Sequence, residues 1–332
     1  MRPIYGSLHH QQGVPSVDVL GIDISKDDFH ACLLQGEREK PNSFANNKAG
    51  YKQLLRWLKN RRCANVHACL EATGAYWMGV AQALYDSGMV VSVVNPSRTA
   101  FYARSLLRRT KTDKVDAAMI AQFCRTQQPD AWEPPAPEIL EIRGLLTYRD
   151  HLVAERVKLE QAISQLQVSK ELSRLHQRQM KTLDAQVKAI EEQLKVVVKR
   201  HAHIADYAAR LTAVKGIGLL TALFLIAWLP VDRLRNEKAA AAYVGLTPRE
   251  RRSGTSVRGQ VRICKTGNGT LRKALYLAAT SAMRYNAVLA PFAARLRDAG
   301  KASKVVHVAV MRKMVVLAYR LLKGTFSIPA AA

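Results

Sequence analysis

The chain has 332 residues, of which 48% are apolar, and a formal net charge of +25. That apolar content is sufficient for packed cores, which excludes a disordered protein. The positive charge indicates a polyanionic partner, either nucleic acid or an anionic membrane surface. Nucleic acid is favoured, because the longest apolar run, residues 219–230, is well short of the roughly 20 residues that a membrane-spanning helix needs.

The five cysteines are scattered and form no Cys-x-x-Cys pair; they are Cys32, Cys63, Cys69, Cys124 and Cys264. Neither a disulfide framework nor a zinc site fits this spacing, so we expect buried free thiols in a reducing compartment. Residues 1–16 are polar and lack the apolar core of a signal peptide. These features predict a flexible tail at 1–16 and a cytoplasmic, nucleoid-associated protein.

Residues 17–132 alternate between strand and helix patterns. The spacing predicts a hairpin over 17–35 with its turn at 25–28, a helix at 51–59 and a short strand at 66–70. A helix at 76–86, a β-branched strand at 90–94 and a helix from Asp113 to about residue 125 follow. Strands that alternate with helices predict an α/β domain.

Four carboxylates stand at the ends of these elements: Asp23, Glu71, Asp113 and Asp116. Asp23 lies between two isoleucines on a strand, where an ionised side chain is costly unless a charge such as a metal ion compensates it. Asp113 and Asp116 are three residues apart and share one helix face. The set fits a two-metal site, although an isolated Asp-x-x-Asp pair is usually a capped, solvated helix start and Glu71 alone is equally ordinary. Cations lie just upstream of Asp113 and are candidates for nucleic-acid binding: Arg104, Arg108, Arg109 and Lys111.

A proline-rich break at 133–137 predicts a domain boundary. Beyond it, Leu183, Val187, Ile190, Leu194 and Val197 follow heptad spacing. An earlier apolar set fits the same register only if Arg156 takes a core position. Because residues 167–180 break the pattern, we expect an antiparallel pair of long helices over 133–206, which serves either as a spacer or as a self-association element.

From Tyr207 onward the chain has 22 Lys and Arg against four acids, a net charge of +18. No strong strand pattern appears, so we expect an all-α basic domain over 207–332. Ser253 follows two arginines, and a Ser-Gly pair is most often a turn. Further candidates for contact with a polyanion are Arg251, Arg252, Arg258 and Lys265.

Several blocks, in the same order, resemble the DEDD transposases of insertion sequence family 110. They include the segments around Asp23, Glu71, Asn95-Pro96 and Asp113-x-x-Asp116, and the C-terminal blocks at 214–218, 243–248, 253–254, 265–268 and 271–275. The resemblance covers roughly residues 17–323. Lys215 stands where the family usually has proline, and residues 228–230 replace a commonly acidic stretch.

The resemblance implies a RuvC-like, RNase H-type domain whose four acids are Asp23, Glu71, Asp113 and Asp116, with Mg²⁺ or Mn²⁺ as cofactor. It implies that Ser253 is a nucleophile that forms a phosphoserine link to a cut strand. It also implies donor and target DNA and a structured guide RNA as partners, and a homo-oligomer in which dimers assemble into a tetramer. The expected activity is RNA-guided DNA strand cleavage and transfer for an insertion sequence.

Two other functions are compatible with these residues. A metal-dependent junction endonuclease would use the acids to activate water and leave Ser253 structural. A non-catalytic RNA-binding protein would use neither, although the presence of all four acids argues against it.

Overall fold

The computed structural model describes residues 17–63, 65–74, 76–106, 113–249, 252–253, 257–258 and 262–326. For residues 113–115, 249, 252–253, 257–258 and 262 it describes the backbone alone. The chain divides into two compact units, residues 1–134 and residues 135–332. The expected proline-rich break therefore contains the division between the two units.

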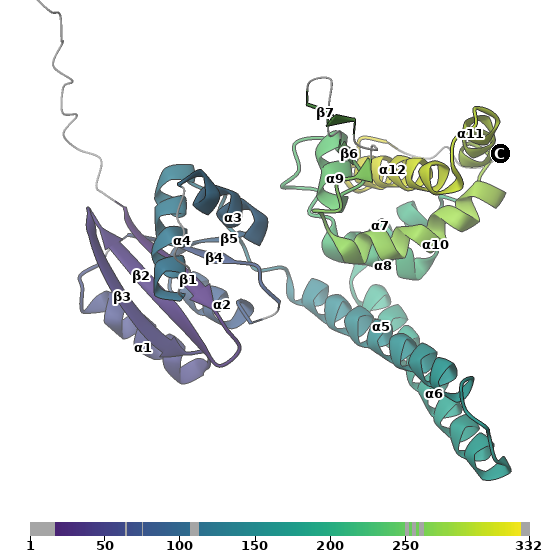
Figure 1. The fold of residues 1–332 in the computed structure, drawn as a ribbon, viewed down its shortest axis with the longest axis horizontal. Coiled ribbons are helices and arrows are strands. Elements are labelled where there is room, and N and C mark those ends of the chain that lie inside the picture. Colours follow the sequence, from purple (N-terminus) through teal and green to yellow (C-terminus); the bar gives the residue numbers. More distant parts are fainter. Residues whose placement is uncertain are drawn as a thin grey trace, which may run out of the picture. The chain divides into compact units, whose positions relative to one another are not determined.

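A mixed five-stranded sheet of order β3-β2-β1-β4-β5 forms the centre of the first unit (Figure 1). The strands β1 (Asp18–Ile24), β2 (Asp28–Gln35) and β3 (Arg38–Ala45) are antiparallel neighbours. The strands β4 (Val66–Glu71) and β5 (Val90–Val94) run parallel to β1. The carboxyl ends of β1, β4 and β5 consequently meet at one edge of the sheet.

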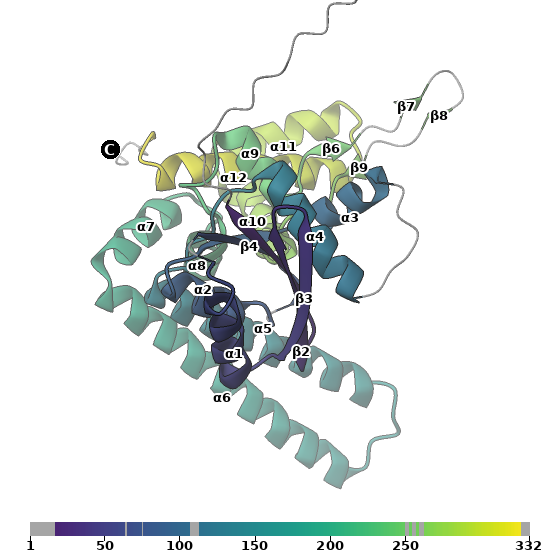
Figure 2. The same ribbon diagram turned by 90° about the vertical axis from the view of Figure 1, so that its left-hand side faces the viewer.

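Helices cover both faces of this sheet, as the two views show (Figures 1 and 2). On one face, α1 (Lys48–Lys59) and α2 (Met78–Asp86) pack against Leu20 and Ile22 of β1. On the other, α4 (Asp113–Gln127) packs against Val19 of β1 and Cys69 of β4, with α3 (Pro96–Ser105) beside it. Side chains alternate between faces along a strand, which assigns each strand residue to one of the two cores.

The predicted hairpin, the strands at 66–70 and 90–94 and the three helices are confirmed within a few residues. The strand β3 and the helix α3 were not predicted. The β3 segment is polar and contains Pro41, which is tolerated in an edge strand, and Phe44 is its one buried residue. The strand at 90–94 ends at Asn95-Pro96, and the same pair starts α3, since Asn95 caps the helix and Pro96 occupies its first turn.

The close approach of α4 to β1 depends on Gly21. A Cβ built on Gly21 would lie 2.2 Å from the backbone oxygen of Ala117 and 2.3 Å from the backbone nitrogen of Ala121. Because both neighbours are backbone atoms, no side chain can rotate away. Any residue other than glycine at this position must displace the helix.

We expect Gly21→Ala to lower the free energy of unfolding by at least about 1–3 kcal/mol, the usual cost of overpacking a core. Urea unfolding of the full chain measures this loss. Gly144→Ala is the matched control, because a Cβ on Gly144 would meet nothing within 4 Å and alanine favours a helix by about 1 kcal/mol. Equal stability of the two variants would contradict the prediction.

Two long antiparallel helices open the second unit, α5 (Pro137–Ile163) and α6 (Lys170–Arg200). The ion pairs Arg200–Glu141, Arg149–Glu191 and Arg156–Asp184 fix their antiparallel direction. The predicted pair is therefore confirmed, but the break is shorter than expected because Ser169 caps α6 and lets it start at Lys170. Arg156 does not take the core position that the heptad register required; its partly exposed side chain forms an ion pair with Asp184.

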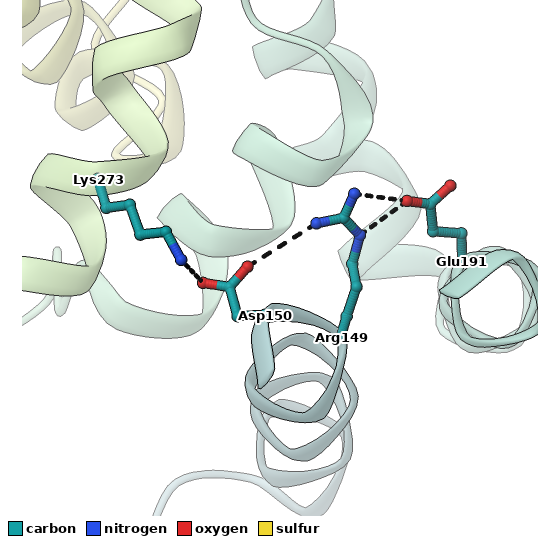
Figure 3. A network of polar contacts seen from close by, with 4 residues as sticks. All are labelled: Arg149, Asp150, Glu191 and Lys273. Carbon is teal, nitrogen blue, oxygen red and sulfur yellow. Dashed lines mark hydrogen bonds and ion pairs between the residues drawn. The ribbon is translucent and has the colours of Figure 1, made fainter. Parts of the chain in front are cut away.

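A polar network fastens this pair to the helices that follow (Figure 3). Arg149 bonds to Glu191 of α6 at 2.7 Å and contacts Asp150 at 3.8 Å, while Asp150 accepts a bond from Lys273 of α10 at 2.8 Å. Nearby, Arg143 of α5 donates from Nε to the backbone oxygen of Ala227 at 2.7 Å. These contacts join the helical pair and the basic helices in one unit.

The remaining helices share one core that also includes Ile142, Leu146 and Leu194 of the pair. They are α7 (Ala202–Thr212), α8 (Leu219–Trp228), α9 (Glu237–Val244), α10 (Gly269–Tyr285), α11 (Leu289–Asp298) and α12 (Ser303–Leu322). None of the helices within the described ranges is long and apolar enough to cross a membrane. The division expected between residues 206 and 207 falls inside α7, and the three-domain scheme remains a prediction.

The expectation that residues 207–332 are all-α is wrong in one detail. Two-residue strands pair as β6 (Pro248–Arg249) with β9 (Arg262–Ile263), and as β7 (Arg252–Ser253) with β8 (Val257–Arg258). Ladders this short have no room for an alternating apolar pattern, so periodicity does not predict them. The region is mostly helical.

The five cysteines are free thiols. Cys32, Cys69 and Cys124 are buried as expected, whereas Cys63 and Cys264 are half-buried. Burial is the main cause that raises the pKa of the Cys32 thiol to about 11. That thiol therefore stays protonated and unreactive at neutral pH.

Candidate active site

Two of the predicted acids stand side by side at the carboxyl edge of the sheet. The parallel register of β1 and β4 aligns Ile22 with Leu70. Asp23 and Glu71 are the next residues on these strands, and both are half-buried. The sheet thus places the two carboxylates in neighbouring positions.

Both acids belong to the face that α4 covers. Val19 and Cys69 pack in the core beneath α4, whereas Ile22 and Leu70 pack in the core beneath α1 and α2. Because side chains alternate along a strand, Asp23 has the orientation of Val19, and Glu71 that of Cys69.

The direction of α4 brings its first turn to the same edge. Cys124, near the end of α4, lies 4.0 Å from the backbone oxygen of His67 at the start of β4. Ala117, near its start, lies over Gly21, closer to the end of β1. The helix therefore runs antiparallel to β1 and β4 and begins at the edge where Asp23 and Glu71 lie.

Asp113 and Asp116 are in this first turn. Asp116 is half-buried, and the backbone of Asp113 begins the helix. The structure thus brings the positions of all four predicted acids to one edge of the sheet. The positive end of the α4 dipole favours carboxylates at this place.

A threonine on a neighbouring helix holds Glu71. Thr99 of α3 is fully buried, and its hydroxyl is within hydrogen-bond distance of Glu71 Oε1 and 2.8 Å from the backbone oxygen of Pro96. As the acceptors are a carboxylate and a carbonyl, the hydroxyl donates. This contact restricts the orientation of the Glu71 carboxylate.

The acids suit a hard divalent cation, because carboxylate oxygens are the ligands that Mg²⁺ and Mn²⁺ prefer. Asp23, Glu71, Asp113 and Asp116 are the residues that would hold it. Among the side chains that the structure describes, which do not include that of Asp113, no group of three His, Cys, Asp or Glu is close enough to bind one ion. The fit therefore rests on the type of the donors and on their common edge.

The other predicted residues lie elsewhere. Arg104 is exposed on α3, 5.9 Å from the Phe101 ring centroid, and Lys265 is exposed after β9. The backbones of Arg252 and Ser253 form β7, and that of Arg258 belongs to β8. Four predicted residues lie outside the described residues: Arg108, Arg109, Lys111 and Arg251.

Sequence reasoning missed two residues at the acid edge. Thr99 carried no signal because the segment after Pro96 was not recognised as a helix. His30 of β2 pairs directly with Asp23 across the antiparallel ladder and is half-buried. Directly opposite residues lie on the same face, and correct hairpin registration of 17–35 would have predicted this neighbour.

Known proteins resemble this chain over most of its length. A family model described as transposase matches residues 20–170, and one described as transposase of the IS116/IS110/IS902 family matches residues 208–294. A pilin gene-inverting protein of Moraxella lacunata is 30% identical over 92% of this chain and 95% of its own length. The transposase for insertion sequence element IS1111A of Coxiella burnetii is 24% identical over 83% of this chain and 80% of its own length.

The matched families and relatives define the class of protein as an enzyme that recombines DNA, a transposase or recombinase. The chain belongs to the IS116/IS110/IS902 family of transposases. DNA is therefore its substrate, in agreement with the excess of positive charge.

We expect Thr99→Val to raise the Mn²⁺ concentration needed for half-maximal DNA cleavage by about 10–100-fold, the range for losing a group that orients a metal ligand. Thr99→Ser keeps the hydroxyl and should restore the metal dependence. The control Thr126→Val makes the same substitution near the C-terminal end of α4, far from the acid edge. There the threonine hydroxyl donates to the backbone oxygen of Gln122, so this variant should behave like the parent protein. An unchanged metal dependence of a folded Thr99→Val protein would show that this contact does not orient Glu71 for metal.

Proposed function

We propose that this transposase is guided by a structured RNA and cuts and rejoins DNA through a phosphoserine at Ser253, assisted by Mg²⁺ or Mn²⁺. The observation that carries the metal-dependent part is the meeting of Asp23, Glu71 and the first turn of α4 at one edge of a mixed sheet. This arrangement, with helices on both faces, also supports a RuvC-like, RNase H-type domain.

In the proposed chemistry, Ser253 Oγ forms a bond to phosphorus and its proton passes to water. The bond from phosphorus to one sugar oxygen breaks, and that oxygen takes up a proton. Metal held by the four acids would stabilise the charge on the phosphate oxygens, which matters because a serine hydroxyl is a weak nucleophile. In the rejoining step, the oxygen of a different sugar forms the bond to phosphorus and gives up its proton. The bond between phosphorus and Ser253 Oγ breaks, and Ser253 regains a proton.

The acids and the serine belong to different units of the chain. Among the described residues, several acids of the second unit are already paired with cations, Asp232 with Lys323 and Glu237 with Arg320. The proposal therefore needs the acid edge of one first unit and the Ser253 of one second unit to act on the same phosphate. A dimer or tetramer would allow the two to come from different protomers.

RNA guidance and the tetramer are supported by family membership. A protein that leaves sequence recognition to base pairing needs contacts to duplex shape and phosphate rather than to bases. The large positive charge of the chain suits this division. To test this part of the proposal, the bases of the pairing loop in the RNA are changed. If the RNA guides the protein, insertion should move to the DNA sequence that is complementary to the new loop.

We expect the parent protein to form a DNA adduct that survives denaturation, and Ser253→Ala to form none. Ser256→Ala is the matched control, since it removes the neighbouring serine hydroxyl and should leave the adduct intact. Asp23→Asn should lower strand cleavage by at least about 100-fold, because it weakens charge stabilisation at the reacting phosphate. Gel electrophoresis of labelled DNA measures both quantities.

The acid edge is also compatible with a metal-dependent junction endonuclease, in which water takes the place of Ser253. In that case Ser253→Ala would still cleave DNA, no adduct would form with any variant, and Asp23→Asn would still be inactive. That combination of results would overturn the phosphoserine proposal and leave the metal site standing.

A further inference from the structure

The exposed face of α1 carries a stripe of cations. Lys48, Lys52, Arg56 and Lys59 are all exposed. At 3.6 residues per turn they fall within a sector of about 80° and extend about 16 Å along the helix. The opposite side of α1 is buried through Gly50, Leu54 and Leu58. We call these four residues the α1 stripe.

Acids are absent from this part of the sequence. Residues 40–70 contain neither Asp nor Glu, and the cations there are Lys40, Lys48, Lys52, Arg56, Lys59, Arg61 and Arg62. Within the described part of the chain, no side chain of the α1 stripe forms an ion pair. By contrast, the exposed cations Arg174, Lys195 and Arg210 of the second unit each pair with an acid one turn away.

The spacing within the stripe is unfavourable for the isolated helix. Lys48 and Lys52, and Lys52 and Arg56, are four residues apart, where like charges repel. Lys48 also lies in the first turn, which contains no acid and where the helix dipole disfavours a cation. Arg56 and Lys59 are favoured at the other end, so the cost falls mainly on the first two turns. A local cost without an internal compensating contact points to a functional surface.

The stripe and the acid edge lie on opposite faces of the sheet. The helix α1 packs on the face of Leu20 and Ile22, and α4 packs on the face of Val19 and Cys69 (Figures 1 and 2). A phosphate bound to the stripe is therefore separated from the acids by the sheet. It is therefore not a phosphate that the acids of the same first unit cut.

We propose that the α1 stripe is a second nucleic-acid surface that binds the backbone of duplex DNA away from the cleavage point. A row of unpaired cations complements a polyanion, because each one that neutralises a phosphate releases a condensed counterion. Duplex DNA is the occupant because it is the polyanion on which a transposase acts. Such a surface anchors the substrate while the opposite face carries out cleavage. It rests on the family assignment and on the proposed acid edge, but not on the phosphoserine.

The salt dependence of DNA binding tests this surface. For the full-length triple variant Lys52→Gln/Arg56→Gln/Lys59→Gln, we expect the slope of log affinity against log salt for a blunt DNA duplex to fall in magnitude by about 3. The melting temperature should change little, because the loss of the Lys52 repulsions offsets the loss of the favourable positions of Arg56 and Lys59 in the last turn of α1. A lower slope together with a retained melting temperature separates loss of contact from loss of folding.

The control variant Arg174→Gln/Lys195→Gln/Arg210→Gln removes the same charge from ion-paired positions and should keep the parent slope. If it lowers the slope equally, net charge rather than the stripe governs binding, and the proposal fails. It also fails if the folded stripe variant keeps the parent slope. If the stripe variant lowers the salt slope only for an RNA duplex of the same sequence, the stripe binds RNA and the proposal of a DNA surface is wrong.

Discussion

The contact between α4 and β1 at Gly21 is the constraint on which the candidate site depends. With no side chain at this position, the backbone of α4 lies directly on the strand, as the 2.2 Å distance from a built Cβ to Ala117 O demonstrates. The helix can therefore run antiparallel over β1 and β4 and begin where both strands end. Had a larger residue stood there, the first turn of α4 would move away from Asp23 and Glu71.

This packing places acidic side chains and basic side chains on opposite faces of the same sheet. On the face of α4, the positions of the four acids lie at one edge, where the first turn of α4 begins and the hydroxyl of Thr99 donates to Glu71. On the face of α1, cations occupy the outer surface of a helix whose inner surface is apolar. The apolar layers keep cations and acids apart, so the α1 stripe does not neutralise the carboxylates.

Much of the first unit followed from local pattern. Apolar residues alternate over 17–35, and β-branched residues fill 90–94. Both patterns are typical of strands, so these elements were predictable. The failures have a physical cause in each case. As an edge strand, β3 needs little apolar surface, and in α3 the Asn-Pro pair that ends a strand also caps a helix. Thr99 was lost with α3, because its role comes from a contact 28 residues away in the chain.

The grouping of the four acids at one edge of the sheet could not be predicted from sequence spacing, because it depends on the three-dimensional packing. Spacing alone placed Asp113 and Asp116 on one helix face, but which end of β4 they approach depends on the direction of α4. That direction follows from long-range packing, in which Cys124 meets His67 and Ala117 meets Gly21. Sequence periodicity predicts which face of a helix is buried, but not the direction in which the helix runs across a sheet. The family resemblance supplied the grouping that periodicity lacked.

The second unit limits how the chemistry can be organised. Its described region contains no cluster of metal-binding side chains, and Asp150, Asp232 and Glu237 are occupied by cations. An unassisted serine at Ser253 has no group in that region to hold a metal ion against the phosphate. If Ser253 is the nucleophile, cleavage must wait until a first unit, from the same chain or another, presents its acid edge. Under that mechanism, neither unit would cut DNA by itself.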